Sequence, residues 1–231
     1  MKKLILFLLL IFNLYAISSA QNPRSLIAGV NTKFKQVNNY EAIVVIKTEI
    51  PFIKMLPVSA TIYFKQPDKI RIKSKGIAIL PKQGIDDLLK TLADTISYSA
   101  LYQGEELLKN VNVAVVSIIP LADTSDMILG KFWIDPKQSL VMRSQITTRT
   151  NGTILSEYVY GKFASFALPD SMTVTVDTKK FKIPKAVSAD INNYNSSAKD
   201  PAKQSKKGRI ILRFSEYKIN QGIPDEIFKQ K

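Results

Sequence analysis

The chain has 231 residues with no cysteine and no histidine. Disulfides, thiolate metal sites and cysteine nucleophiles are therefore excluded, and the commonest general base and zinc ligand is missing. These absences argue against an enzyme, and we expect no catalytic residue, metal site or cofactor. The formal net charge of +14 predicts attraction to anionic lipid headgroups, acidic proteins or nucleic acid, although a basic surface with no specific partner explains it equally well.

The first twenty residues have the layout of a secretion signal. Lys2 and Lys3 precede an apolar run, and the small residues Ser18 and Ala20 precede the cleavage site expected before Gln21. A membrane anchor is the alternative, but the run is shorter than the roughly 20 residues that span a bilayer. We expect cleavage after Ala20, a periplasmic location in which nucleic acid is not the partner, and a single domain over residues 21–231.

A helix is predicted over residues 24–38. Asn22 followed by Pro23 is typical of a helix start, with asparagine as the N-cap and proline in the first turn. The apolar residues that follow recur at helical spacing and fall on one stripe: Leu26, Ile27, Val30, Phe34 and Val37.

Strands are predicted over residues 42–46, 58–65 and 69–73. In the second and third, apolar residues alternate with polar ones, which indicates one buried and one solvated face. Gln66, Pro67 and Asp68 predict a turn between them. The apolar connection over residues 50–57 packs either on a hydrophobic ligand surface or on the core of the protein itself.

A second helix is predicted over residues 85–96, after Pro81 and Gly84. Its stripe is formed by Ile85, Leu88, Leu89, Leu92 and Ile96. Asp86 and Asp87 lie in its first turn, where the helix dipole favours them. Residues 97–110 are ambiguous, and a further helix there is one interpretation.

The remaining segments predict strands over residues 111–119, 129–134, 140–150, 154–163, 172–177 and 209–219. Asn151 and Gly152 predict a hairpin, and the polar residues 188–208 predict a mobile loop. Hairpin-linked strands favour an antiparallel sheet, and about nine of them are too many for a flat one. We predict an α+β fold: a curled antiparallel sheet, or incomplete β-barrel, with helices covering its concave hydrophobic face.

No catalytic constellation is found. Ser196 and Lys199 match the S-x-x-K pattern of serine acyl-enzymes, but they lie in the polar loop, where a lysine keeps its proton. Asp123 and Asp126 lack the glycine and the later glutamate of a calcium loop. We interpret these matches as chance.

Three segments resemble the LolA-like family of periplasmic outer-membrane lipoprotein carriers and sorting proteins. They are residues 60–71, with strand, proline turn and strand; residues 132–141, with Phe132, Trp133 and a second turn; and the ending over residues 217–225. The resemblance implies an incomplete barrel closed by helices, which encloses a hydrophobic cavity for lipoprotein acyl chains. Carriers of this type place an arginine before the turn proline to help gate the lid, and here Gln66 occupies that position.

The resemblance implies a monomer that binds lipoprotein acyl chains or other lipids for delivery towards the outer membrane. An inner-membrane release complex and an outer-membrane acceptor are the partners that such delivery would need. The alternative is a periplasmic envelope sensor or assembly module on the same fold, which recognises a protein partner without moving lipid. The expected cavity residues are Ile62, Phe64, Ile70, Ile72, Leu80, Val113, Val115, Phe132 and Ile134. The expected lid residues are Ile85, Leu88, Leu89 and Leu92.

Overall fold

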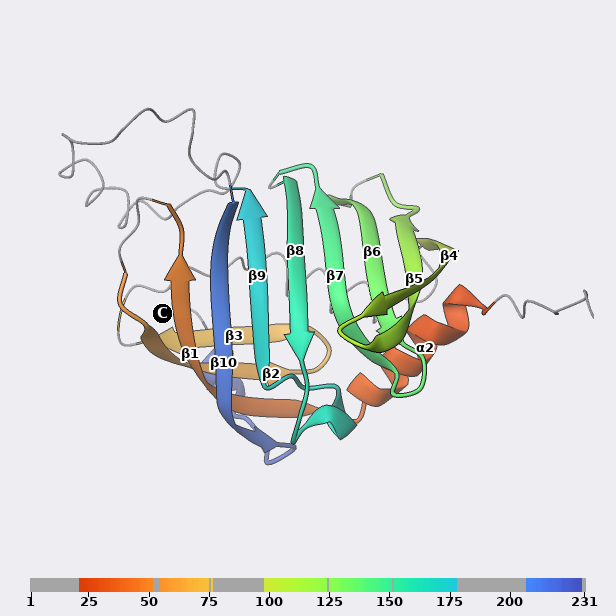
Figure 1. Cartoon of the computed structure of the whole chain (residues 1–231). Coiled ribbons are helices and arrows are strands. Elements are labelled where there is room, and N and C mark those ends of the chain that lie inside the picture. Colours follow the sequence, from red (N-terminus) through yellow and green to blue (C-terminus); the bar gives the residue numbers. More distant parts are fainter. Residues whose placement is uncertain are drawn as a thin grey trace, which may run out of the picture.

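Ten strands pair side by side in one antiparallel sheet, in the order β3-β2-β1-β10-β9-β8-β7-β6-β5-β4 (Figure 1). The computed structural model describes residues 21–51, 55–74, 76, 98–123, 125–150, 152–177 and 207–229. The strands are β1 (Asn39–Glu49), β2 (Val58–Lys65), β3 (Lys69–Ser74), β4 (Tyr98–Leu108), β5 (Val111–Pro120), β6 (Met127–Asp135), β7 (Leu140–Thr148), β8 (Gly152–Val159), β9 (Ser171–Asp177) and β10 (Lys207–Ile219). Because β3 and β4 form the two ends of the order, the sheet is open.

The helix α2 (Pro23–Phe34) is the only α-helix among the described residues, and it begins where the sequence predicts. The Asn22 side chain accepts a 2.9 Å hydrogen bond from the backbone nitrogen of Arg24, which confirms the N-cap. The helix ends at Phe34 rather than at residue 38, because the chain must turn into β1. There the backbone nitrogen of Asn38 donates to Asn220 Oδ1 at 2.7 Å.

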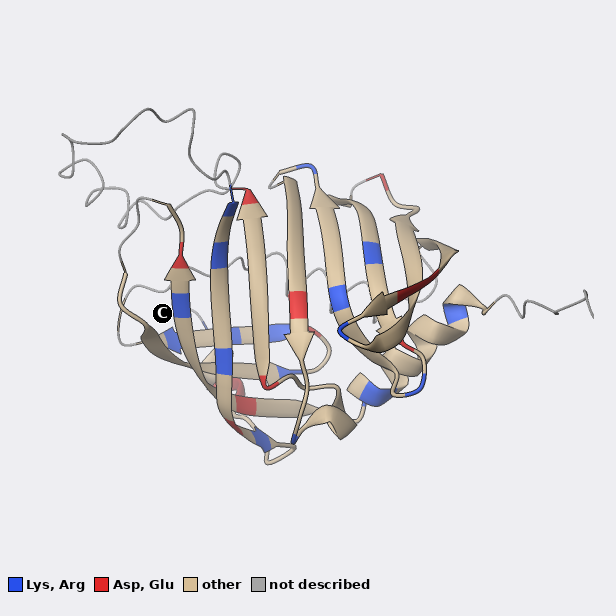
Figure 2. Ribbon diagram, in the orientation of Figure 1, with Lys and Arg blue, Asp and Glu red and all other residues tan. Residues whose placement is uncertain are grey.

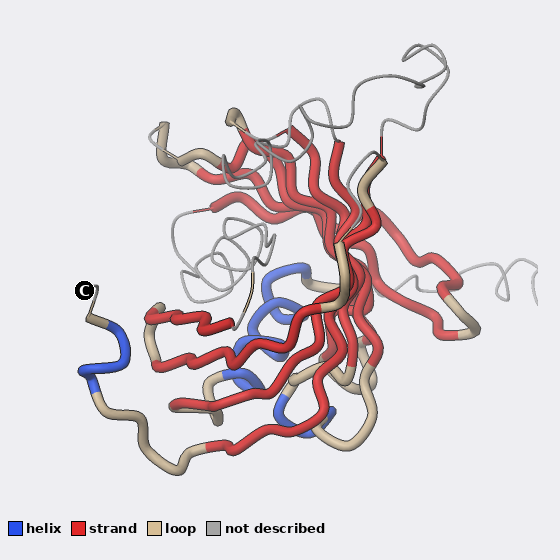
Figure 3. Tube along the Cα trace, turned by 90° about the vertical axis from the view of Figure 1, so that its left-hand side faces the viewer, coloured by secondary structure: helices blue, strands red, loops and turns tan. Residues whose placement is uncertain are grey.

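The sheet curls around the side that carries α2 (Figure 3). A β-bulge between Ile43 and Val44 shifts the register of β1 with β10, so that Ser215 has no residue opposite it and its hydroxyl donates to the carbonyl of Ile43 at 3.3 Å. Such a bulge bends the strand and increases its twist. The first half of β1 consequently turns with β2 and β3 away from the plane of the other strands (Figure 1).

The edge strand β4 corrects the sequence interpretation of residues 97–110, since Tyr98–Leu108 is a strand and not a helix. The turn to β5 consists of Lys109 and Asn110, whose φ values of +49° and +66° fit a tight hairpin turn. The predicted hairpin between β7 and β8 is confirmed, with Gly152 at a φ of +72°. Short 3₁₀ helices, η1 (Ala164–Phe166) and η3 (Asp225–Phe228), complete the described elements.

Alternation along the strands separates the two faces of the sheet. In β1, Ala42, Val44 and Ile46 are buried, whereas Ile43 and Val45 between them are exposed. We call the side that carries Ala42, Val44 and Ile46 the concave face and the opposite side the outer face. The α+β class and the open, curled antiparallel sheet predicted from the sequence are therefore confirmed.

No α-helix in the described part of the chain is long and apolar enough to cross a bilayer. The predicted signal at residues 1–20, the helix at residues 85–96 and most of the polar loop at residues 188–208 lie outside the described residues. Two residues of that loop, Lys207 and Gly208, begin β10, so this strand starts earlier than predicted.

Candidate apolar binding face

The concave face presents one continuous apolar surface across the sheet. The register places Phe132 of β6 beside Ser144 of β7, then Ser156 of β8, then Val174 of β9. One neighbouring row contains Ile154 and Val176, and the other contains Tyr158, Met172 and Leu212. The strand residues of this buried cluster include Ile62, Phe64, Val116, Ile118, Phe132, Ile134, Ile146, Ile154, Met172, Val174, Val176, Ile210 and Leu212.

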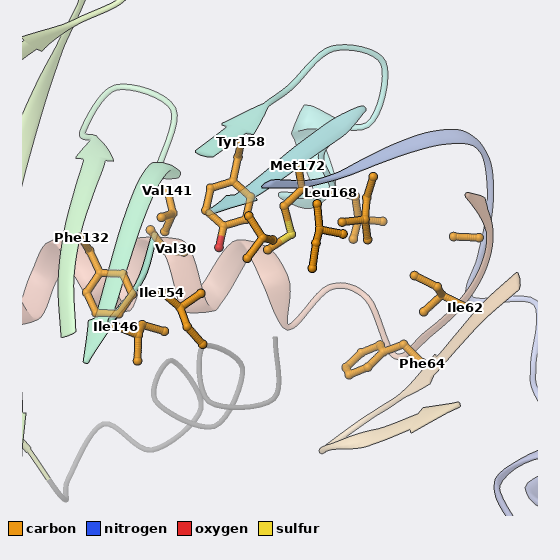
Figure 4. Packing of buried hydrophobic residues seen from close by; sticks show 14 of the residues in the cluster. Val30, Ile62, Phe64, Phe132, Val141, Ile146, Ile154, Tyr158, Leu168 and Met172 are labelled. Carbon is orange, nitrogen blue, oxygen red and sulfur yellow. The ribbon is translucent and has the colours of Figure 1, made fainter. Parts of the chain in front are cut away.

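The helix α2 packs on this surface through its apolar stripe. Ile27 and Val30 are buried in the same cluster, and Leu26 and Phe34 lie against it. Figure 4 shows Val30 on the helix close to Val141 and Tyr158 of the sheet. The amphipathic pattern that forms the helix is therefore what attaches it to the concave face.

Aromatic rings gather where β1, β2 and β10 meet this cluster. Phe64 lies between Phe34 of the helix and Tyr40 of β1, with ring centroids 5.4 Å and 5.2 Å apart. Tyr40 contacts Tyr217 edge-on at 5.6 Å, and Tyr217 contacts Phe163 at 5.0 Å. The two pairs that Tyr217 makes with Tyr40 and Phe163 are edge-on and contribute more than their buried area alone, because positive ring edges meet negative ring faces.

The polar groups on the concave face are neutral. The hydroxyls of Ser144 and Tyr158 form a 3.0 Å hydrogen bond, and Ser156 lies opposite Ser144 in the register. Burial raises the pKa of Tyr158, and burial also holds the pKa of Tyr160 well above its usual range. These phenols keep their protons at neutral pH, so they can offer hydrogen bonds but neither a base nor a charged nucleophile.

Charged side chains are absent from the buried apolar cluster that the structure describes. Among the carboxylate, lysine and arginine side chains of the described chain, Asp135 is the one that is buried, and it is the last residue of β6. There it accepts hydrogen bonds from the backbone nitrogens of Lys137 and Gln138 at 2.9 Å and 3.2 Å. Within the described ranges no three acidic, histidine or cysteine side chains are grouped to bind a metal ion. The concave face therefore suits an uncharged, apolar ligand.

The structure places six of the nine expected cavity residues at this face. Ile62, Phe64, Phe132 and Ile134 are buried in the cluster, and Ile70 and Ile72 pack against it. Leu80 and the four expected lid residues, Ile85, Leu88, Leu89 and Leu92, lie outside the described residues.

Val113 and Val115 differ from the prediction, because they lie on the outer face. They form a second, smaller cluster with Trp133, while Val116 and Ile118 of the same strand join the main one. The run from Val113 to Ile118 is buried on both sides, so its apolar residues do not alternate with polar ones. For that reason the sequence alone could not assign the two faces of β5.

Several residues of the concave face were missed by sequence reasoning. Met172, Val174 and Val176 alternate with polar residues as clearly as β2 does, so the period-2 pattern of β9 was an available signal. Leu212 follows from the same pattern in β10. Tyr158 and Leu168 give no such signal, because only the tertiary fold brings them beneath the helix.

The residue before the turn proline has a structural partner. Gln66 Nε2 donates a 3.2 Å hydrogen bond to the carbonyl of Val37, and its backbone nitrogen donates to the carbonyl of Asn38 at 2.8 Å. Gln66 thus attaches the β2–β3 turn to the junction between α2 and β1.

Comparisons with known proteins give structural matches only. No family model and no curated protein sequence matches the chain. A domain from Vibrio parahaemolyticus, named as an outer membrane lipoprotein-sorting protein domain, superposes with a TM-score of 0.60 at 8% identity, over 91% of this chain and 97% of that domain. A LolA superfamily protein from Nitrosomonas europaea gives 0.58 at 10% identity, over 91% and 99%. A DUF1329 family protein from Desulfovibrio piger gives 0.56 at 11% identity, over 90% and 98%.

These matches extend over most of this chain and over nearly all of each matched chain. The chain therefore has a LolA-like fold, as the resemblance in its sequence implies. At identities this low, the matches establish the fold and leave the ligand to be argued from the concave face.

Proposed function

We propose that the protein binds the acyl chains of lipoproteins or other lipids against its concave face and carries them through the periplasm towards the outer membrane. The observation that carries this proposal is the continuous buried surface from β5 to β2, which contains serine and tyrosine hydroxyls but no charged side chain among the described residues. An acyl chain needs apolar contacts along its length and tolerates only neutral polar groups, because a buried unpaired charge is costly. The LolA-like fold supports the same assignment.

The energetics favour a carrier that transfers its ligand directly to an acceptor. Burying one methylene group contributes about 0.8 kcal/mol, so a long acyl chain contributes on the order of 10 kcal/mol before the costs of binding. Spontaneous release into water from such a complex is slow, since differences in affinity appear mostly in the dissociation rate. We therefore expect the protein to dock on its acceptor before the acyl chain leaves.

A carrier of this kind also needs a cover for its apolar face. An exposed apolar surface of that size favours aggregation, so it must be filled or covered when no ligand is bound. From the sequence we propose the stripe of Ile85, Leu88, Leu89 and Leu92 as this cover, with Pro81 and Gly84 as its hinge. Cleavage after Ala20 would release the mature chain into the periplasm.

We further propose that the protein has no enzymatic activity. The phenols of Tyr158 and Tyr160 have raised pKa values, and the described residues contain no grouping suited to bind a metal ion. The chain also has no histidine and no cysteine to act as base or nucleophile.

Native mass spectrometry tests the proposal. The protein is produced with its own signal, purified from the periplasm without detergent, and measured before and after extraction with organic solvent. We expect an added mass that matches an acylated lipid or lipoprotein, that disappears on extraction, and that returns when a fatty acid is added. A mass equal to the polypeptide alone, together with no rebinding of fatty acid, would contradict the carrier and favour a sensor or assembly module that recognises a protein.

A further inference from the structure

Cationic side chains line the outer face of the β2–β3 hairpin. Lys69, Arg71 and Lys73 alternate along the edge strand β3 with Ile70 and Ile72, which pack on the concave side. Figure 2 shows these cations as a series of blue segments along β3. In the register, Arg71 lies opposite Tyr63 and Lys73 lies opposite Thr61, so all four point to the outer face.

Acidic partners neutralise only part of this positive charge. Lys65 and Lys69 share the carboxylate of Asp225, each at 3.0 Å. In the part of the chain that the structure describes, no acidic side chain pairs with Arg71 or Lys73. The Nε atom of Arg71 is shielded from solvent and has no hydrogen-bond acceptor. Lys73 Nζ lies 5.3 Å from the centre of the Tyr63 ring.

On β1 the same surface continues through Glu41, which lies opposite Tyr63 and pairs with Lys218 at 3.3 Å, and then through two apolar side chains. Ile43 lies opposite Thr61, and Val45 lies opposite Ser59, on the outer face. Their exposed fractions are 39% and 38%, which is high for branched apolar residues in a strand paired on both sides. We call the surface formed by Ile43, Val45, Tyr63, Arg71 and Lys73 the hairpin patch.

We propose that the hairpin patch docks the protein on a bilayer surface that contains anionic lipids. Phosphate groups of the lipids would accept hydrogen bonds from Arg71 and Lys73, which have no acidic partner within the protein. A tyrosine among cations is typical of the membrane–water interface, because its ring is apolar and its hydroxyl is polar. Ile43 and Val45 would enter the same region.

An acidic protein partner is less well matched to this surface. It would satisfy Arg71 and Lys73, but it would gain nothing specific from Tyr63, Ile43 and Val45 at positions where solvent-facing strand residues are ordinarily polar. The inference does not depend on acyl-chain binding, because the hairpin patch lies on the face opposite the apolar cluster.

Vesicle sedimentation tests the inference on the mature chain. The probes are vesicles of phosphatidylcholine alone and of equal parts phosphatidylcholine and phosphatidylglycerol, each at low and high salt. The variant Arg71→Gln with Lys73→Gln removes both charges from the hairpin patch. The matched control Lys137→Gln with Lys162→Gln removes two exposed charges from loops elsewhere, and thermal unfolding of both variants verifies the fold.

We expect the wild type to bind the anionic vesicles at low salt and not the neutral ones. Loss of two interfacial cations weakens such binding roughly 30-fold, while the control keeps most of its affinity. Tyr63→Ser should also weaken binding with both charges intact. Equal loss in the control and the hairpin variant would show non-specific attraction and overturn the inference. Failure of the wild-type protein to bind anionic vesicles would also overturn the inference, whether or not the protein binds fatty acid.

Discussion

The indole nitrogen of Trp133 donates a 2.7 Å hydrogen bond to the carboxylate of Glu106, which joins β6 to the edge strand β4 on the outer face. Lys131 and Arg143 lie 4.7 Å and 5.4 Å from the centre of the indole ring, at distances typical of cation–π contacts. Trp133 also packs with Val113 and Val115. On the outer face, the contacts of Trp133 therefore attach the β4–β5 hairpin to β6. These contacts are separate from the main core on the concave face.

Substitution of Glu106 should loosen this hairpin. In Glu106→Ala the indole loses its acceptor, and we expect the free energy of unfolding to fall by about 1–2 kcal/mol. Urea unfolding measures this change, and acrylamide quenching of the single tryptophan reports its added exposure. Leu107→Ala is the matched control, since Leu107 is 73% exposed and should change stability by less than about 0.5 kcal/mol. Equal effects of the two substitutions would contradict the role of Glu106.

Asn220 joins the end of β10 to the start of β1. Its Oδ1 accepts hydrogen bonds from the backbone nitrogens of Asn38 and Asn39 at 2.7 Å and 3.3 Å, and its Nδ2 donates to the carbonyl of Gln36 at 2.8 Å. Its φ of +57° lies in the left-handed region, which asparagine tolerates better than most residues.

Two substitutions at Asn220 separate these contributions. Asn220→Gly removes the side-chain hydrogen bonds but keeps the left-handed backbone, and we expect a loss of about 1–3 kcal/mol in urea unfolding. Asn220→Ala should lose about 1 kcal/mol more, because alanine is strained at this φ. A glycine variant as stable as the wild type would show that the hydrogen bonds contribute nothing.

Stability should decrease at alkaline pH. Burial raises the pKa of Tyr40, Tyr158, Tyr160 and Tyr217, so these phenols stay protonated in the folded state when their unfolded counterparts ionise near pH ~10. Stability is therefore fully present below pH ~10 and is lost as the pH rises towards the folded pKa values, by about 1.4 kcal/mol per pH unit for each phenol.

Urea unfolding at increasing pH measures this loss, with absorbance of the phenolate as a second readout. Because the phenol of Tyr158 is one of the four, Tyr158→Phe should reduce the slope by one proton. A folded protein whose tyrosines all ionise together near pH ~10 would contradict the burial of these four.

The proposed cover over the concave face makes a separate prediction. Leu88→Asp with Leu92→Asp places two carboxylates against an apolar surface, where they lose hydration. If these residues only cover the face, binding of a fluorescent fatty acid should fall sharply while thermal unfolding shifts by only a few degrees. Lys90→Asp changes the net charge equally on the opposite side of the predicted stripe and should leave binding intact. Loss of folding together with binding would assign the two leucines to the core instead.

The sequence predicts the sheet well because local signals define its hairpins. Such signals involve only a few neighbouring residues. The Asn22 N-cap followed by a proline predicts the start of α2, and the alternation of apolar and polar residues predicts β2 and β9. Burial on both sides of β5 removes the alternation, which is why the sequence does not distinguish the face of Val113 and Val115 from that of Val116 and Ile118. The strand β4 was ambiguous because it is an edge strand with exposed leucines between polar residues.

Tertiary contacts account for the part of the site that the sequence could not predict. Leu168 lies in the connection between β8 and β9, and only the fold brings it into the apolar cluster. The helix α2 packs on strands distant in sequence, as when Arg24 Nη2 donates to the carbonyl of Tyr98 at 3.1 Å. No local pattern specifies such a pairing.

Photochemical crosslinking with a fatty acid that carries a diazirine at the end of its chain tests the central claim most directly. After irradiation and digestion, mass spectrometry locates the modified residues. The account predicts modification on the concave face of β7, β8 and β9, at residues such as Ile146, Ile154 and Val174, with competition by unlabelled fatty acid. Modification confined to their outer-face neighbours Thr147, Leu155 and Thr175, or no modification that unlabelled fatty acid prevents, would contradict it.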